Sequence, residues 1–295
     1  MPILKKLIFA PIFLTVFILL IIQLNPILKS YDFIFSLSVN TLIQLIIIAA
    51  LISLSSFLYI LFATLAGDWK ISLPVGAIAA VMPLMLMEVS LGLVFATAIL
   101  ASILLVSLTL DSALKSYLNF QPASLLGPFI RRLSMLLILA FCLIYFLSSN
   151  KLIAQKGFEI PDSLIDTALK MTPLPTEQTQ LPNISPDQIE MLKKNPELLK
   201  QYNLDPKILD TLDQPNPTND LIKQTVKDQI QNFIKPYQSF IPAGLAVILF
   251  LTLQSLTSIF NLPIHPLLWL TFFILEKTGF TKYQIETREV KKLVV

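Results

Sequence analysis

Long blocks of apolar residues alternate with short polar segments along this chain. The clearest blocks are Leu7–Leu24, Leu42–Ala66, Val89–Leu110, Leu133–Leu147 and Phe240–Phe260. A helix needs about 20 predominantly apolar residues to span the hydrocarbon core of a bilayer. The pattern therefore predicts an all-α protein, a polytopic bundle of transmembrane helices.

Two weaker apolar blocks leave the span count open. Pro74 and Pro83 are expected to interrupt Ile71–Met87, which we interpret as a weaker third span, whereas Pro266–Leu275 is short. If the short block crosses, the basic tail lies outside; if it is re-entrant or interfacial, the tail is cytoplasmic. A third option makes Leu133–Leu147 re-entrant. We predict six full spans and one short or re-entrant segment.

Shifts in composition predict the domain boundaries. Residues 1–149 form a membrane domain with five spans and an interfacial amphipathic element near 111–126, which is broken at Pro122. Residues 150–235 form an extramembrane helical module. A membrane hairpin, or a span plus a re-entrant segment, follows over 236–280. Residues 281–295 form a basic cytoplasmic tail.

Lysine and arginine gather on alternate connections between the predicted spans. The first block has no small-residue cleavage site at its end, so we interpret it as a transmembrane helix that is kept. With a cytoplasmic N-terminus, only Lys29 lies on an outer short connection, and the inner segments hold Lys5, Lys6, Lys70, Lys115, Arg131 and Arg132. Inner loops are enriched in basic residues. This predicts a multi-pass protein of a plasma or cytoplasmic membrane, with residues 150–235 outside the cytoplasm.

The 150–235 module carries a short repeat. Ser185-Pro186, Asn195-Pro196 and Asp205-Pro206 are spaced ten residues apart. Ser, Asn and Asp are preferred helix N-caps, and proline is favoured at the first helical position, so each dipeptide predicts the start of a short helix. The apolar side chains of these helices form either a compact cap or a groove for a partner. The candidate partner-binding residues are Ile189, Leu192, Leu198, Leu199, Leu204 and Leu209.

Composition and charge narrow the protein class. Hydrophobic residues make up 55% of the chain and charged residues 14%, against about 25% charged in typical soluble domains. The single cysteine, Cys142, lies within an apolar block, so we interpret it as a hydrophobic side chain without a disulfide. The net charge is +3, and we expect the lipid bilayer, and no nucleic acid, as a partner.

Candidate catalytic, cofactor and metal-binding residues are isolated in the sequence. His265 is the only histidine, too few for a typical zinc site. Asp32 and Asp68 are separated by a whole predicted span, so they cannot share a site as paired catalytic carboxylates do. Glu88 falls between two spans, where we expect a turn. We therefore predict no catalytic residue, no cofactor and no metal.

Three function classes remain open. We favour a non-enzymatic scaffold or partner-binding protein that uses the 150–235 module to contact another membrane or envelope protein. A transporter or channel for a small solute is the alternative, because prolines near the apolar blocks are typical of broken helices that form binding sites. Few intramembrane charges and only 7 glycines weigh against it. A lipid-active enzyme is the second alternative; it needs a polar cluster, and we assign the mid-span Gln44, Thr97 and Gln254 to hydrogen bonds between helices instead.

Overall fold

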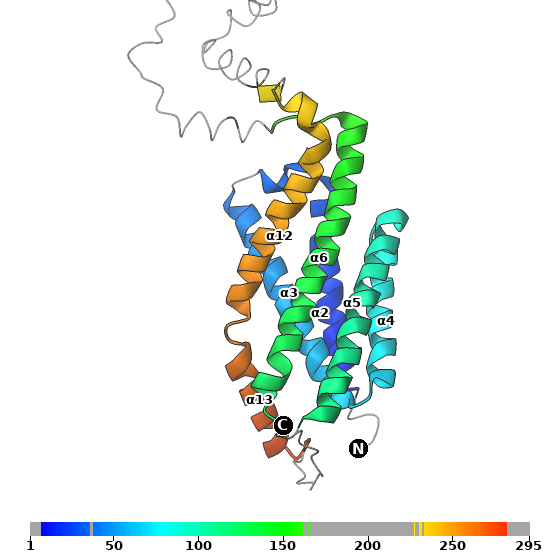
Figure 1. Cartoon of the computed structure of the whole chain (residues 1–295), viewed down its shortest axis with the longest axis vertical. Helices are drawn as coiled ribbons and strands as arrows, with labels where there is room; N and C mark the ends of the chain where they lie inside the picture. The colour runs from blue at the N-terminus through cyan, green and yellow to red at the C-terminus, as the bar shows by residue number, and fades with distance from the viewer. Residues whose placement is uncertain are drawn as a thin grey trace, which may run out of the picture. The chain divides into compact units, whose positions relative to one another are not determined.

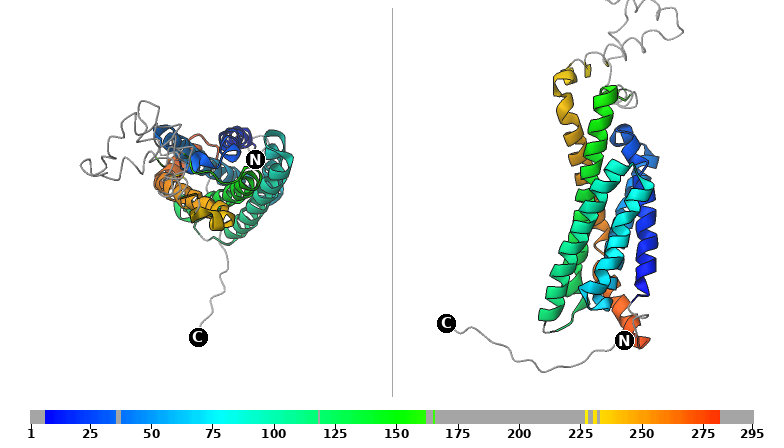
Figure 2. Two further views of the ribbon diagram at one scale, coloured as in Figure 1. Left: turned by 90° about the horizontal axis from the view of Figure 1, so that it is seen from above. Right: turned by 90° about the vertical axis from the view of Figure 1, so that its right-hand side faces the viewer.

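The computed structural model describes residues 7–35, 38–117, 119–161, 165, 227, 230–231 and 233–281 (Figures 1 and 2). This part of the chain is helical and contains no strand. The α-helices are α2 (Phe9–Leu24), α3 (Val39–Ala66), α4 (Trp69–Leu86), α5 (Val89–Ser116), α6 (Pro122–Lys156), α12 (Ile241–Phe260) and α13 (Ile264–Lys277). The 3-10 helices are η1 (Ile27–Lys29), η2 (Asp32–Ile34) and η3 (Lys235–Phe240).

Six helical segments of the described chain are long and apolar enough to cross a membrane, namely α2 together with η1, α3, α4, α5, α6, and η3 together with α12. Helix α13 has 14 residues. At a rise of about 1.5 Å per residue it is about 21 Å long, which is short of a hydrocarbon core of about 30 Å. The structure thus confirms an all-α bundle with six candidate spans and one shorter helical segment.

Two compact units make up the chain. The first unit contains residues 1–29, 43–148 and 246–295, and the second contains residues 30–42 and 149–245. Helices α3, α6 and α12 contribute residues to both units. The second unit therefore draws on the segment before α3 as well as on the region after residue 149.

Tight connections set the antiparallel order of α3, α4 and α5 in the first unit. Gly67 and Asp68 join α3 to α4, and Met87 and Glu88 join α4 to α5. Gly67 has φ +67°, a conformation that glycine adopts without strain, and its N–H donates to the carbonyl of Ala63. The Asp68 carboxylate accepts the N–H of Lys70 at 3.0 Å and so caps the start of α4. The polar break after the second apolar block is thus a C-cap followed directly by an N-cap.

Aromatic side chains of α2 and α3 fill the centre of the first unit. Phe13, Phe17, Tyr59 and Phe62 are each 1% exposed or less. The rings of Phe13 and Tyr59 lie with their centroids 5.2 Å apart, a separation typical of favourable aromatic pairs. This contact packs the first helix into the unit.

Glycine at one position allows α5 to lie directly against α4. A Cβ added at Gly92 would lie 2.9 Å from the carbonyl oxygen of Pro83 and 3.2 Å from the Cα of Leu84. Both neighbours are backbone atoms, which cannot move as a side chain does. Small residues at helix contacts let backbones approach in this way.

Three details of the expected spans differ from the structure. Helix α4 continues through Pro74 and Pro83, although these prolines were expected to interrupt it. The expected amphipathic element over 111–126 is divided, because α5 continues to Ser116 and α6 begins at Pro122. Helix α6 passes through Pro128 and has 35 residues, far more than the expected Leu133–Leu147. Hydropathy identifies only the apolar part of a helix. The backbone hydrogen bonds of the helix can continue through polar residues on either side of that part.

Helix α13 lies at the end of the first unit where α2 and α6 begin. A Cβ added at Gly127 in α6 would lie 3.4 Å from Nε2 of His265, near the start of α13. Phe272 in α13 packs edge-on against Phe120, and Phe280 packs edge-on against Phe9. The start and the end of α13 therefore contact the same end of the unit, so α13 does not run through it. Residues Leu133–Leu147, for which a re-entrant segment was the alternative, lie within the continuous α6, which is long and apolar enough to span a membrane.

A matched pair of glycines tests the α4–α5 contact. Gly92→Ala should destabilise the protein by about 1–3 kcal/mol, because the added methyl overpacks against backbone. Gly244 occupies the same fourth position of its own helix and has nothing within 4 Å of an added Cβ, so Gly244→Ala should be neutral or stabilising by up to about 1 kcal/mol. Thermal unfolding in detergent measures both variants, and equal melting temperatures for the two would contradict the close contact.

Candidate functional site

The predicted partner-binding residues lie outside the described part of the chain. They are Ile189, Leu192, Leu198, Leu199, Leu204 and Leu209, together with the three proline-started helices that carry them. Their grouping into one surface stays a prediction. The described residues instead show how the two ends of the 150–235 region pack within the second unit.

A small hydrophobic core holds the attachment together. Ile153, Phe158, Ile160 and Ile165 are buried in it, and further apolar side chains pack around them, namely Tyr31, Phe35, Ile234 and Ile241. The ring of Phe158 lies 5.6 Å from that of Tyr31 and 6.0 Å from that of Phe35. We call these eight residues the base cluster. It joins three stretches of sequence that are far apart along the chain.

Hydrogen bonds fasten the same three stretches. The backbone N–H of Glu159 donates to the hydroxyl of Tyr31 at 3.2 Å. The side-chain amide of Gln231 donates to the carbonyl of Phe158. Phe158 and Gln231, which precede and follow residues 166–226 along the chain, are therefore in direct contact.

Polar side chains line a cavity of about 260 Å³ between α6 and α12 in the first unit. It is lined by Arg131, Ser134, Gln254, Thr257, Ser258, Asn261 and Leu262. We call it the α6–α12 cavity. Its volume is well above the minimum of about 10–15 Å³ that one water molecule requires.

The hydroxyl groups of the α6–α12 cavity already donate their protons to the backbone. Ser134 donates to the carbonyl of Ile130 at 3.0 Å, and Ser258 donates to that of Gln254 at 2.7 Å. Thr257 donates within its own helix at 2.8 Å. A hydroxyl that has donated its single proton can offer only lone pairs. Toward the cavity these side chains are therefore hydrogen-bond acceptors.

Two amide side chains leave acceptors without a partner. The Oε1 atom of Gln254 and the Oδ1 atom of Asn261 are buried, and neither has a hydrogen bond within the described residues. Asn261 is only 8% exposed. A buried polar atom without a partner costs about 1–3 kcal/mol. Two side chains that line the α6–α12 cavity therefore carry acceptors, and a hydrogen bond from a donor to either one would stabilise the protein.

One cation completes the lining. Arg131 is exposed, and in the described part of the chain it forms no ion pair, whereas Lys115 pairs with Asp111 on α5. The close packing of His265 on Gly127 lies one helical turn before Arg131. Arg131, with its five fixed N–H donors, is suited to bind a phosphate or carboxylate.

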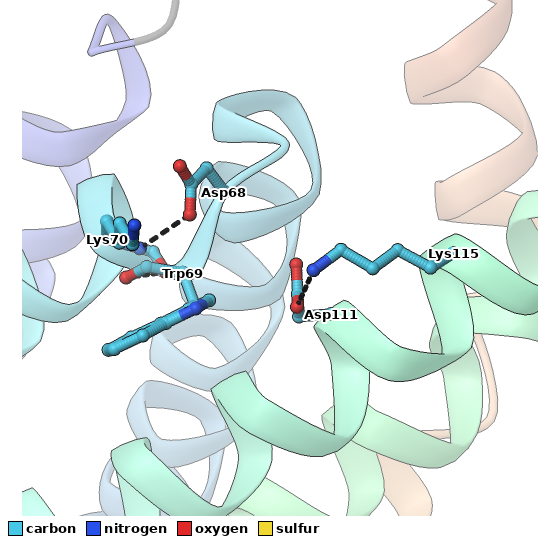
Figure 3. A network of polar contacts seen from close by, with 6 residues as sticks. Asp68, Trp69, Lys70, Asp111 and Lys115 are labelled. Atoms are coloured by element: carbon cyan, nitrogen blue, oxygen red, sulfur yellow. Dashed lines mark hydrogen bonds and ion pairs between the residues drawn. The ribbon is translucent and has the colours of Figure 1, made fainter.

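A second polar group lies where α3, α4 and α5 meet. The Tyr59 and Ser107 hydroxyls are 2.7 Å apart in a buried hydrogen bond between α3 and α5. Beside it, a crevice of about 10 Å³ is lined by Asp68, Trp69 and Asp111 among others (Figure 3). This volume holds about one water molecule, so we assign the group to helix packing.

The isolated candidates from the sequence occupy structural positions. Glu88 lies exposed at the connection between α4 and α5, as expected of a turn residue. Cys142 is buried. No group of three or more metal-binding side chains comes together in the described residues. The assignment of Thr97 to a bond between helices is wrong, because its hydroxyl donates to Val94 on its own helix. Gln254 lines the α6–α12 cavity, and its Oε1 atom forms no hydrogen bond with another described helix.

Sequence reasoning missed the α6–α12 cavity, although a signal for it was present. The polar residues Gln254, Thr257, Ser258 and Asn261 recur at i, i+3, i+4 and i+7, the spacing of one helix face. Arg131 and Ser134 share a face of α6 in the same way. Taken singly, each of these residues is only an isolated polar position within an apolar block or at its end. What the sequence could not show was that the two polar faces line one cavity.

Comparison with protein-family models, with curated proteins and with solved structures finds no match for this chain.

A double-mutant cycle tests the Tyr59–Ser107 bond. Tyr59→Phe and Ser107→Ala should show a coupling free energy of about 0.6 kcal/mol, with an upper bound of about 1.7 kcal/mol, the range for hydrogen bonds between membrane helices. Ser102 is the control, because it lies on the same helix but donates to its own backbone at Ala98. Tyr59→Phe combined with Ser102→Ala should give additive losses in unfolding measurements. Equal coupling in both cycles would contradict the assignment.

Proposed function

We propose that the protein is a multi-pass integral membrane protein that presents residues 150–235 to another membrane or envelope protein and does not act as an enzyme. The observation that carries this proposal is the base cluster. A tether that only links two helices needs no core of its own, yet here Phe158 and its neighbours are buried beside the point where the segment leaves and returns. Closing both ends of a long segment limits its freedom and fixes where it is displayed.

The distribution of basic residues supports an orientation for this display. In the first unit, α3 ends and α4 begins at one end, where α2 and α6 also begin (Figure 1). The basic residues at this end are Lys70, Lys115, Arg131, Arg132 and Lys277, and Lys29 follows α2 at the opposite end. Basic residues favour the cytoplasmic side. We therefore assign Lys70 to the cytoplasm and Lys29 to the outside.

Labelling of single cysteines tests this orientation. Cys142→Ala removes the only cysteine, which is buried, and gives a silent background. Lys29→Cys and Thr179→Cys should react with a membrane-impermeant maleimide in intact cells or spheroplasts, whereas Lys70→Cys should react only after permeabilisation. The reverse pattern would overturn the assignment. Labelling of all three positions in permeabilised cells shows that each cysteine is reactive.

Photocrosslinking tests the partner role directly. A photoreactive amino acid in place of Leu198 or Leu209 should give one discrete protein adduct in intact cells, because these side chains belong to the proposed contact surface. Thr179, a polar position of the same region, is the control and should give none. Leu204→Asp should remove the adduct while membrane levels of the protein stay unchanged. Adducts of equal yield at Thr179 and Leu198, or none at Leu198 and Leu209, would reject the proposal.

The α6–α12 cavity favours a second candidate function, transport of a small polar solute. Its polar lining is the one feature in the described helices that a membrane scaffold does not require. Arg131 precedes the apolar part of α6, and Asn261 follows the last residue of α12. The cavity therefore lies toward one end of these helices. A binding site that alternates between two sides is expected near the middle of the spans, so we place this candidate second.

A further inference from the structure

We propose that the α6–α12 cavity binds the headgroup of a phospholipid whose phosphate carries a neighbouring hydroxyl or amine. Arg131 binds the phosphate, and the amide oxygens of Gln254 and Asn261 accept hydrogen bonds from the hydroxyl or amine. This inference rests on the membrane placement proposed above. It is independent of the partner that residues 150–235 contact.

The positive charge of Arg131 favours a ligand with a phosphate group. Arg131 is the one charged residue in the lining, and it has no ion pair within the described chain. An arginine binds phosphate oxygens through parallel N–H donors, and such charge-assisted bonds are about twice as strong as neutral ones. Basic pockets between transmembrane helices on the cytoplasmic side are typical sites for lipid headgroups.

The acceptors in the cavity select the rest of the headgroup. An ionised phosphodiester offers only acceptors, so it cannot satisfy the Oε1 atom of Gln254 or the Oδ1 atom of Asn261. The hydroxyls of Ser134, Thr257 and Ser258 have already donated their protons. A ligand that satisfies these two oxygens directly supplies N–H or O–H donors itself. Phosphoethanolamine and phosphoglycerol groups have such donors next to the phosphate, whereas phosphocholine has none, because its nitrogen is fully methylated.

The surface beside the cavity favours a lipid over a soluble phosphate. On α12, the polar face from Asn261 back to Gln254 continues along the helix as Leu251 and Val247, which are 58% and 56% exposed. On α6, Met135 follows Arg131 one turn later and is 43% exposed. Leu262 at the cavity itself is 72% exposed. Exposed apolar side chains on both lining helices offer acyl chains a surface that continues from the headgroup.

The depth of the site is consistent with a headgroup. Arg131 lies two residues before the apolar block Leu133–Leu147, and Asn261 directly follows the end of α12. Gln254 and Asn261 are seven residues apart, about 10 Å along a helix axis. The cavity thus reaches from the expected interface level toward the apolar zone, which is the position of a phospholipid headgroup and its glycerol.

The test uses the purified full-length protein in detergent, titrated with phospholipids of equal chain length and observed by native mass spectrometry. Phosphatidylethanolamine and phosphatidylglycerol should each bind at one saturable site, about tenfold or more tighter than phosphatidylcholine. The ethanolamine and choline lipids differ only in N-methylation, so this comparison isolates the donors. Equal affinity for the three lipids would overturn the proposal without any mutation.

Two pairs of variants locate the site. Arg131→Gln should weaken phosphatidylglycerol and phosphatidylethanolamine binding by about tenfold or more, whereas Arg132→Gln, with the same change in charge on the next residue, should change it less than about twofold. Gln254→Leu should reduce the preference for ethanolamine over choline, and Gln44→Leu on α3 should preserve it. Melting temperatures show which variants are folded. Equal effects of Arg131→Gln and Arg132→Gln would show general charge attraction and reject the site.

A titration with soluble phosphates distinguishes a lipid headgroup from a free phosphate compound as the ligand of the cavity. Glycerol 3-phosphate and inorganic phosphate are titrated into the same protein, and neither should bind at concentrations that saturate the lipid site. If glycerol 3-phosphate binds in an Arg131-dependent way and the phospholipids do not, the lipid proposal is wrong and the cavity belongs to the solute-transport function. The partner role of residues 150–235 is tested by crosslinking, so failure of either proposal is recognised separately.

Discussion

Backbone N–H and C=O groups in an apolar surrounding must find their hydrogen-bond partners within the chain, and this requirement shapes the first unit. A continuous helix satisfies it locally, and α6 extends over 35 residues. Pro74 and Pro83 have no N–H, so α4 continues through them with one backbone hydrogen bond fewer at each proline. At the reversal between α3 and α4, the left-handed Gly67 and the capping carboxylate of Asp68 satisfy backbone groups that the two helix ends leave free. At the reversal between α4 and α5, the N–H of Met87 donates to the carbonyl of Pro83.

Side-chain hydroxyls in the helices also need hydrogen-bond partners, and most find one in the backbone of their own helix. Buried polar atoms without such a partner are the exceptions. Thr64, Ser102 and Thr252 each donate to a carbonyl one turn earlier on their own helix. The hydroxyl oxygens of Ser53, Ser55 and Ser56 on α3 are buried without a hydrogen bond to any described residue, and their small size suits close helix packing. Gln254 and Asn261 differ, because their buried amide oxygens, also without a partner among the described residues, belong to side chains that line a cavity together with an arginine. A large polar group beside empty space indicates a ligand, whereas a small one beside packed helices does not.

Hydropathy predicted the six candidate spans, because bilayer thickness converts directly into a length of apolar sequence. It placed Glu88 at a turn and gave α13 a length too short to span. It misjudged the ends of α5 and α6, because nothing in hydropathy stops a helix at a polar residue such as Asp111 or Ser124. The α6–α12 cavity was out of reach for a different reason: the polar faces that form it are more than 120 residues apart, and only packing brings Arg131 and Asn261 together.

The contact of Phe9 with Phe280 has a consequence for the order of assembly. A ribosome delivers α2 first and α13 last among the described helices, so the surface at the start of α2 stays uncovered until about 270 further residues have been made. The loop closed by this contact is nearly the whole chain, although the entropy of closing a loop grows only slowly with its length. The first unit therefore cannot be completed before α13 and Phe280 have been synthesised, and the contact of Phe9 with Phe280 is among the last to form.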